Sequence, residues 1–174
     1  TMRGNEQKPF DGKVEYDVWV TIDSDIIFTP KHLIELIEDT DKYPVISGMY
    51  RMSNSKFIAA VKEWNLAHFI KNGVYEFIDP ETFDKDVKHH EVAYVGMGFM
   101  ACTREVLEKI EYPYFNYPTE ELQVDGKTIS QVFSEDVSFS KRVTDAGYKI
   151  VINTDLRVGH EKKLHGPLAD MQLV

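Results

Sequence analysis

The alternation of short apolar segments with capped helices constrains the fold of this chain most strongly. Four segments are rich in β-branched and aromatic side chains and are too short for typical helices, which predicts strands at residues 16–22, 43–50, 93–101 and 148–153. Helices are expected between them at residues 30–39, 104–110 and 135–146. This order predicts an α/β sandwich with a mixed sheet, because not every pair of strands is joined by a helix.

The ends of two helices carry their own signals. Thr29 supplies a capping hydroxyl, and Pro30 fits the first position of the helix that follows. Ser134 is an N-cap candidate for the last helix, and Gly147 is placed to end it.

The remaining stretches are expected to be irregular. Residues 65–91 sustain no helical or strand period, so we expect loops and short strands there. Asp125-Gly126 marks a turn. Residues 1–15 are interpreted as an irregular lead-in and residues 161–174 as a tail or lid, with the whole chain forming one domain.

Composition limits the partners and the compartment. The 174 residues are 43% hydrophobic and carry a formal net charge of −9 at pH 7. Such a chain is expected to be soluble and, without a local basic patch, to repel nucleic acid and anionic membranes. No apolar run approaches the roughly 18 residues that cross a bilayer. Cys102 is the only cysteine, which suits a reducing compartment and predicts a cytoplasmic protein.

A pair of carboxylates follows the first predicted strand. Asp23 and Asp25 are separated by one residue, so in an extended chain both side chains project to the same side. Two carboxylates this close repel each other unless a cation lies near them, and hard divalent ions prefer such oxygen ligands. The pair also falls outside the carboxyl end of a strand, where open α/β sheets bind ligands. The alternative is that two short acidic residues merely close a strand and cap a turn.

Three further features can carry chemistry. Glu135-Asp136 opens the last predicted helix, where the helix dipole favours acidic residues in any case and where a carboxylate can act as a general base. His160 follows the last strand; a lone histidine is more often structural, but if it joins Asp25 at a cation, its imidazole favours Mn²⁺ over Mg²⁺. Arg51 follows a strand end, where it can reach a phosphate or form a surface salt bridge.

The order of these motifs resembles a GT-A-fold glycosyltransferase of the family 2 kind. The resemblance is carried by Asp23-Ser24-Asp25, Val95-Gly96-Met97-Gly98-Phe99-Met100, Glu135-Asp136 and Val158-Gly159-His160. It implies the GT-A sandwich, with a mixed, mainly parallel central sheet. It also implies transfer of a sugar from a nucleotide-sugar donor to a hydroxyl of a carbohydrate or other acceptor, with inversion favoured over retention.

The resemblance assigns three residues to a metal site. Asp25 becomes the direct ligand of Mn²⁺ or Mg²⁺, His160 a second ligand, and Asp23 a contact to the ribose, to a metal-bound water or to the metal. The physics agrees with this implication, because an acidic protein can hold the diphosphate of a sugar nucleotide only if a cation reverses the local sign of charge.

The resemblance also assigns residues to the donor and to proton transfer. Gly96 and Gly98 border the donor sugar and the acceptor. Asp136 becomes the catalytic base, with Glu135 beside it. A base is needed on the face opposite the leaving group if the sugar is transferred by direct displacement.

The chain departs from the family pattern before Asp23. Family members place the strands and helices of a nucleotide-binding half ahead of that motif, whereas residues 1–15 are mostly irregular here. The resemblance therefore implies a domain truncated at its N-terminus, a divergent form, or a sheet completed by another chain. An exposed sheet edge would favour homo-oligomers.

Two other functional classes stay open. One is a noncatalytic module that binds a carbohydrate or a nucleotide. The other is a haloacid-dehalogenase-like phosphatase, whose nucleophile motif superficially fits Asp23-Ser24-Asp25, although Ile26-Ile27 replaces the small flexible turn expected after it.

Overall fold

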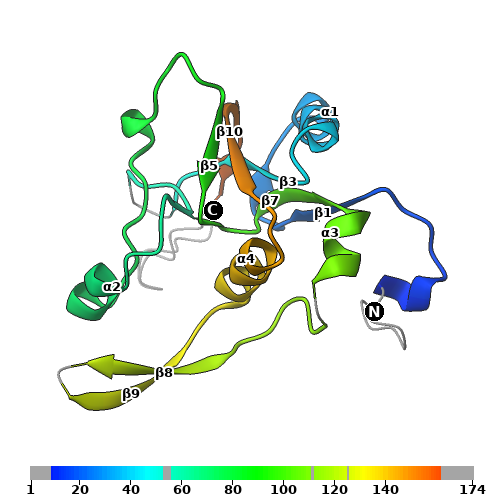
Figure 1. Ribbon diagram of the computed structural model, residues 1–174. Helices are drawn as coiled ribbons and strands as arrows, with labels where there is room; N and C mark the ends of the chain where they lie inside the picture. The colour runs from blue at the N-terminus through cyan, green and yellow to red at the C-terminus, as the bar shows by residue number, and fades with distance from the viewer. Residues whose placement is uncertain (1–8, 53–55, 111, 125, 162–174) are drawn as a thin grey trace, which may run out of the picture.

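A computed structural model describes residues 9–52, 56–110, 112–124 and 126–161. Its centre is a five-stranded sheet (Figure 1). In spatial order the strands are β1 (Val18–Ile22), β7 (Phe99–Thr103), β3 (Val45–Met49), β10 (Ile150–Arg157) and β5 (His89–Val92). The mixed α/β class expected from the sequence is confirmed.

The sheet is mainly antiparallel, so the expectation of a mainly parallel sheet was wrong. Of the neighbouring pairs, β3–β10 is parallel, whereas β7 runs antiparallel to both β1 and β3, and β5 runs antiparallel to β10. The reason is the place of β7. The segment after β1 gives a strand–helix–strand unit whose two strands run the same way, but β7 enters between them from later in the chain.

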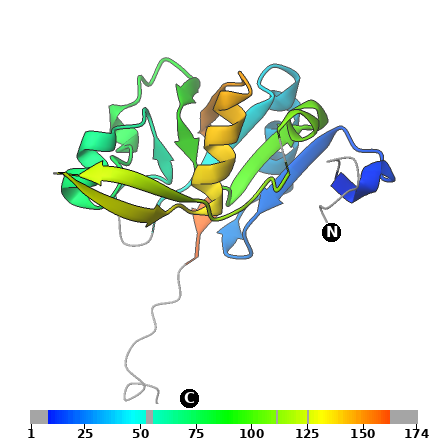
Figure 2. The same cartoon turned by 60° about the horizontal axis from the view of Figure 1, so that its bottom comes forward.

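Helices cover both faces of the sheet. Alternate residues of each strand point to opposite sides, so a strand that is apolar throughout needs packing partners on both faces. The helices are α1 (Pro30–Glu38), α3 (Arg104–Lys109) and α4 (Glu135–Asp145). Met100 and Cys102 belong to the core that includes α3 and α4, whereas Phe99 and Ala101 pack in a second core with Leu36 of α1. Figures 1 and 2 show α1 on the face opposite α3 and α4. The fold is therefore a three-layer sandwich.

The remaining elements are short. Three two-stranded sheets pair β2 (Ile26–Ile27) with β11 (Gly159–His160), β4 (Ala60–Val61) with β6 (Tyr94–Val95), and β8 (Thr119–Val124) with β9 (Lys127–Val132). The other helical segments are α2 (Leu66–Asn72) and the 3-10 turns η1 (Pro9–Gly12), η2 (Asp39–Asp41) and η3 (Pro80–Thr82). Across the described ranges, the helices lack the length and apolar character that a membrane span requires.

The helix ends agree with the sequence signals. The Thr29 hydroxyl accepts a hydrogen bond from the His32 amide (3.3 Å), and Pro30 is the first residue of α1. α4 begins directly after Ser134, although the Ser134 side chain makes no capping hydrogen bond, and Gly147 follows the helix with φ 89°. Residues 1–8 of the expected lead-in and residues 162–174 of the expected tail lie outside the described residues.

Two elements were missed. The expectation of loops and short strands at residues 65–91 was wrong at α2, whose two turns are too short to show a period; its signals were the caps Asn65 and Gly73. The β8–β9 hairpin has polar strands that lack an apolar run, and every second residue of β8 is exposed. Asp125 of the expected turn lies outside the described residues, but Val124 pairs with Lys127 across it.

Candidate functional site

The two aspartates lie where β1 leaves the sheet. The amide of Asp23 donates to the Gly98 carbonyl (2.9 Å), which holds the end of β1 beside the start of β7. The amide of Ile26 donates to the Asp23 carbonyl (3.1 Å) and closes a tight turn. Asp23 therefore lies beside the glycine segment, while Asp25 leads into β2.

The pairing of β2 with β11 brings His160 to Asp25. Ile26 is opposite His160 in this ladder, and the amide of Glu161 donates to the Asp25 carbonyl (2.7 Å). Nε2 of His160 lies 3.3 Å from Oδ2 of Asp25, and the His160 side chain is 13% exposed. The Asp25 side chain is 34% exposed, so two residues from distant parts of the sequence meet in a half-buried contact that solvent can reach.

The other ring nitrogen of His160 fixes how this contact is made. Nδ1 lies 2.9 Å from the carbonyl oxygen of Arg51. Because a carbonyl oxygen can only accept, Nδ1 carries the hydrogen. In the neutral imidazole the Nε2 lone pair then points at the Asp25 carboxylate, so two electron-rich atoms face each other. A proton on Nε2 or a cation beside both groups relieves this repulsion, and metal-binding histidines commonly donate their other N–H to a carbonyl in this way.

Tyr50 fills the space between the glycine segment and His160. Its hydroxyl accepts from the Gly98 amide (3.0 Å), and its ring meets the His160 ring edge-on with centroids 5.3 Å apart. A Cβ on Gly96 would collide with this hydroxyl, and a Cβ on Gly98 would lie 2.9 Å from it and 3.0 Å from Oδ2 of Asp23. The two glycines therefore make room for a side chain of the protein itself.

Asp136, in the first turn of α4, faces the same region. The Tyr94 hydroxyl donates to Oδ2 of Asp136 (3.3 Å), and the Met97 amide also donates to this carboxyl. Burial raises the pKa of Asp136 to about 6, helped by the charges of Glu135 and Asp23 and opposed by the two hydrogen bonds. The carboxyl is thus mostly ionised at neutral pH and is more basic than an ordinary aspartate.

The two members of the Glu135-Asp136 pair have different surroundings. The Tyr117 hydroxyl is hydrogen-bonded to Glu135, which raises the pKa of that tyrosine. Asp136 instead shares its surroundings with Asp23 and Asp25, because all three charges add to the effect of burial in raising the pKa of Tyr50. We call Asp23, Asp25 and Asp136 the carboxylate cluster.

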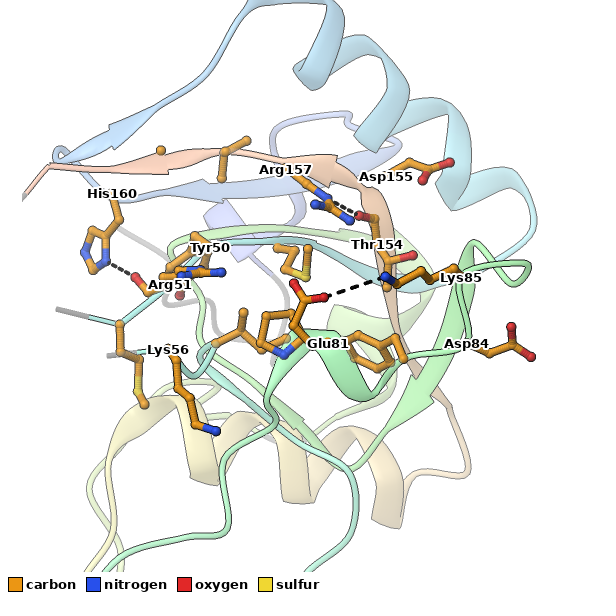
Figure 3. Close-up of a pocket in the computed structure, with 17 residues that line it drawn as sticks. Tyr50, Arg51, Lys56, Glu81, Asp84, Lys85, Thr154, Asp155, Arg157 and His160 are labelled. Atoms are coloured by element: carbon orange, nitrogen blue, oxygen red, sulfur yellow. Dashed lines mark hydrogen bonds and ion pairs between the residues drawn. The ribbon is translucent and has the colours of Figure 1, made fainter. Parts of the chain in front are cut away.

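A pocket of about 1000 Å³ adjoins this cluster (Figure 3). It lies beyond the carboxyl ends of the parallel strands β3 and β10, the position at which α/β sheets bind ligands. Tyr50 and His160 line the pocket, whereas the three members of the carboxylate cluster do not. Its size suits a sugar or a nucleotide. The pocket and the cluster are therefore neighbours that meet at Tyr50 and His160.

Asn153, which is fully buried, shapes the wall of this pocket. Its Nδ2 donates to Asp39 (2.7 Å), and its Oδ1 accepts from the amides of Asp155 (3.0 Å) and Leu156 (3.1 Å). β10 shifts its register against β3 just beyond this residue. The buried amide therefore stabilises the irregularity that leads the strand into β11. Sequence reasoning missed Asn153 and Tyr50, since each reads as the last residue of a strand.

The candidate cation ligands are few. Within the ranges that the structure describes, no group of three or more His, Cys, Asp or Glu side chains is placed to hold a metal ion. The protein would therefore supply Asp25 and His160. Two protein ligands suffice where substrate phosphates and water complete the shell.

The comparisons with known proteins show a similarity of fold and nothing further. No protein-family model and no curated protein matches this chain. Among solved structures it is similar to the crystal structure of A197 from STIV, with a TM-score of 0.50 and 21% sequence identity. The similarity covers 85% of this chain and 59% of A197, so the chain spans little more than half of that protein.

Proposed function

We propose that this chain is a metal-dependent glycosyltransferase that moves a sugar from a nucleotide-sugar donor to an acceptor hydroxyl with inversion. The contact between His160 and Asp25 carries the proposal. When the imidazole is neutral, the Arg51 carbonyl directs the Nε2 lone pair of His160 at a carboxylate, and a divalent cation beside both groups would replace this repulsive contact with two coordinate bonds.

The two ligand atoms suit a shared cation. Neighbouring ligands in an octahedral shell with bonds of about 2.1 Å are about 3 Å apart. Nε2 of His160 and Oδ2 of Asp25 are 3.3 Å apart. One imidazole nitrogen with one carboxylate oxygen favours Mn²⁺ over Mg²⁺. In this proposal Asp23, whose Oδ2 faces Gly98, contacts the donor or a water of the ion.

The negative charge of the protein explains why a cation would be needed to bind a diphosphate. A chain with a net charge of −9 cannot hold a diphosphate beside the carboxylate cluster unless a cation offsets the repulsion. When bound, the ion would also stabilise the charge that grows on the leaving nucleoside diphosphate.

Asp136 is the general base in this proposal. Its pKa of about 6 leaves it ionised at pH 7 while strengthening it as a proton acceptor. The Tyr94 hydroxyl and the Met97 amide hold the carboxyl in place. Asp136 accepts the proton of the acceptor hydroxyl as that oxygen attacks the anomeric carbon. Burial raises the pKa of Asp136 most, and the charge of Glu135 adds to this effect.

The test is Mn²⁺-stimulated turnover of a panel of nucleotide sugars by the full chain. Chelation should abolish release of the nucleoside diphosphate, and added Mn²⁺ should restore it. Asp25→Ala and His160→Ala should each lower the rate about 100-fold or more. Glu121→Gln removes an exposed carboxylate from β8 and should leave the rate unchanged.

Other outcomes would select another function. Binding of a nucleoside diphosphate or a sugar without turnover of any donor would indicate a noncatalytic binding module. Covalent phosphorylation of Asp23 would indicate a phosphatase. Turnover that is unchanged in both Asp25→Ala and His160→Ala would contradict the proposed site.

A further inference from the structure

The pocket beside the carboxylate cluster carries cationic side chains in an acidic protein. Arg51, Lys56, Lys85 and Arg157 line it, together with three acidic residues. In Figure 3, Arg157 and His160 lie on one side of the pocket and Lys56 lies on the other. The cations come from separate segments of the chain, so the fold brings them together.

The two lysines of the pocket are paired with carboxylates. Lys56 forms an ion pair with Asp79 (2.7 Å), and this contact lowers the pKa of Asp79. Lys85 lies 3.8 Å from Glu81 on its own segment. These contacts neutralise the lysines and also one of the three acidic residues that line the pocket.

The other two acidic residues are engaged outside the centre of the pocket. The Asp84 carboxylate accepts from the Asp86 amide within its own turn (3.0 Å). Asp155 acts on Lys88, whose pKa is raised first by its hydrogen bond to Glu35 and then by neighbouring charges that include Asp155. Glu81 and Asp84 therefore have local partners, and the charge of Asp155 acts on Lys88.

The two arginines are different. Nε of Arg157 donates to the Thr154 carbonyl (3.0 Å), which orients the guanidinium group. Among the residues that the structure describes, neither Arg51 nor Arg157 forms an ion pair with a carboxylate. The charge of Arg51 makes only a late contribution to the lowered pKa of Asp79, after the hydrogen bonds from Lys56 and the Glu81 amide. Both residues are exposed. Met49 and Arg157 are partners in the parallel register, and Arg51 lies two residues beyond Met49, so the two arginines share one face.

We propose that this pocket binds an anionic group of a substrate, a phosphate or a carboxylate, between the guanidinium groups of Arg51 and Arg157. Guanidinium groups stay charged in proteins and bind such anions through paired hydrogen bonds. The Arg51 carbonyl holds Nδ1 of His160 (2.9 Å), so an anion bound here lies next to the candidate cation site. Assigning the anion to a substrate of sugar transfer rests on the proposed function, whereas the anion site itself does not.

Two substrates can supply this anion. One is the donor, through its diphosphate. The other is an acceptor that carries a phosphate or a carboxylate, such as a sugar phosphate or a uronic acid. The chemistry at the arginines is the same in both cases, so binding experiments must separate the two sources.

The first experiment measures binding of inorganic phosphate and of a hexose phosphate to the full chain in the presence of a chelator. Both ligands should shift the backbone amide NMR signals of Arg51, Arg157 and Gly159, and the unphosphorylated hexose should shift them far less. Arg51→Gln and Arg157→Gln should each weaken binding about tenfold. Lys127→Gln removes an exposed cation from β9 and should bind as the wild type does.

The amide spectra also report folding, so a loss of binding with an unchanged spectrum is attributable to the arginine. Phosphate that does not bind the wild type, or binds both arginine variants equally well, would overturn the proposal. Asp25→Ala separates it from the proposed function, because this variant should keep phosphate binding and lose Mn²⁺ binding.

The second experiment identifies the source of the anion. It measures the affinity for a nucleoside diphosphate with Mn²⁺ present. A tenfold loss in Arg157→Gln would support the site and assign it to the donor diphosphate. An unchanged affinity, together with weakened hexose phosphate binding, would support the site and assign it to the acceptor.

Discussion

Replacing Asp136 with asparagine should stabilise the folded protein at neutral pH while removing the proposed base. The carboxyl binds its proton more tightly in the folded chain, with a pKa of about 6, than at the ordinary value of 3.8. The proton on Asp136 therefore stabilises the folded state most below about pH 4, and this stabilisation is lost as the pH rises through about 6. The difference between the two pKa values of Asp136 corresponds to about 3 kcal/mol in the free energy of unfolding. Asparagine carries no charge at any pH and keeps an oxygen that can accept from Tyr94.

The assay is urea unfolding of Asp136→Asn and wild type, followed by tryptophan fluorescence at about pH 4.5 and about pH 7.5. The free energy of unfolding of the variant minus that of the wild type should be about 2 kcal/mol larger at about pH 7.5 than at about pH 4.5. Comparing two conditions cancels the hydrogen bonds that the substitution alters equally at both. The exposed Glu121→Gln should show almost no such change. A pH-independent difference for Asp136→Asn would refute the idea that burial tunes this carboxyl.

Turnover by Asp136→Asn should fall about 100-fold or more, and near-normal turnover would exclude Asp136 as the base. Gly98→Ala places a methyl 2.9 Å from the Tyr50 hydroxyl and 3.0 Å from Oδ2 of Asp23, so it should destabilise the fold by about 1 to 3 kcal/mol and weaken Mn²⁺ binding by calorimetry. Tyr50→Phe leaves the buried Gly98 amide without its acceptor and should cost about 1 to 3 kcal/mol in urea unfolding, with no change in Mn²⁺ affinity. Asn153→Leu removes bonds to Asp39 and two backbone amides and should cost about 3 kcal/mol or more; a loss below about 1 kcal/mol would contradict its structural role.

Local signals predicted the elements that local chemistry determines. Thr29-Pro30 marked the start of α1 because a capping hydroxyl and a fixed φ act within one turn. β1 and β3 could be predicted because a buried strand requires a run of apolar side chains, and that run can be recognised in the sequence. The position of β7 between them was not predictable in this way, because it depends on how the two faces pack against α1 on one side and α3 and α4 on the other.

The sequence likewise predicted some contacts of the candidate site and not others. The order of motifs led to the expectation that Asp25 and His160 meet, and the β2–β11 pairing brings them to 3.3 Å. The part played by Tyr50 was hidden, because nothing within its own strand indicates that its hydroxyl fills the space that Gly96 and Gly98 leave open. Such contacts arise from tertiary packing and leave no local pattern.

The most direct test of the cation site is to locate Mn²⁺ by anomalous scattering in crystals of the full chain soaked with Mn²⁺ and a nucleoside diphosphate. A site formed by Asp25 and His160 predicts a strong peak about 2.1 Å from a carboxylate oxygen of Asp25 and from Nε2 of His160. No peak there under saturating Mn²⁺, with the two side chains still 3.3 Å apart, would contradict the metal-dependent transferase.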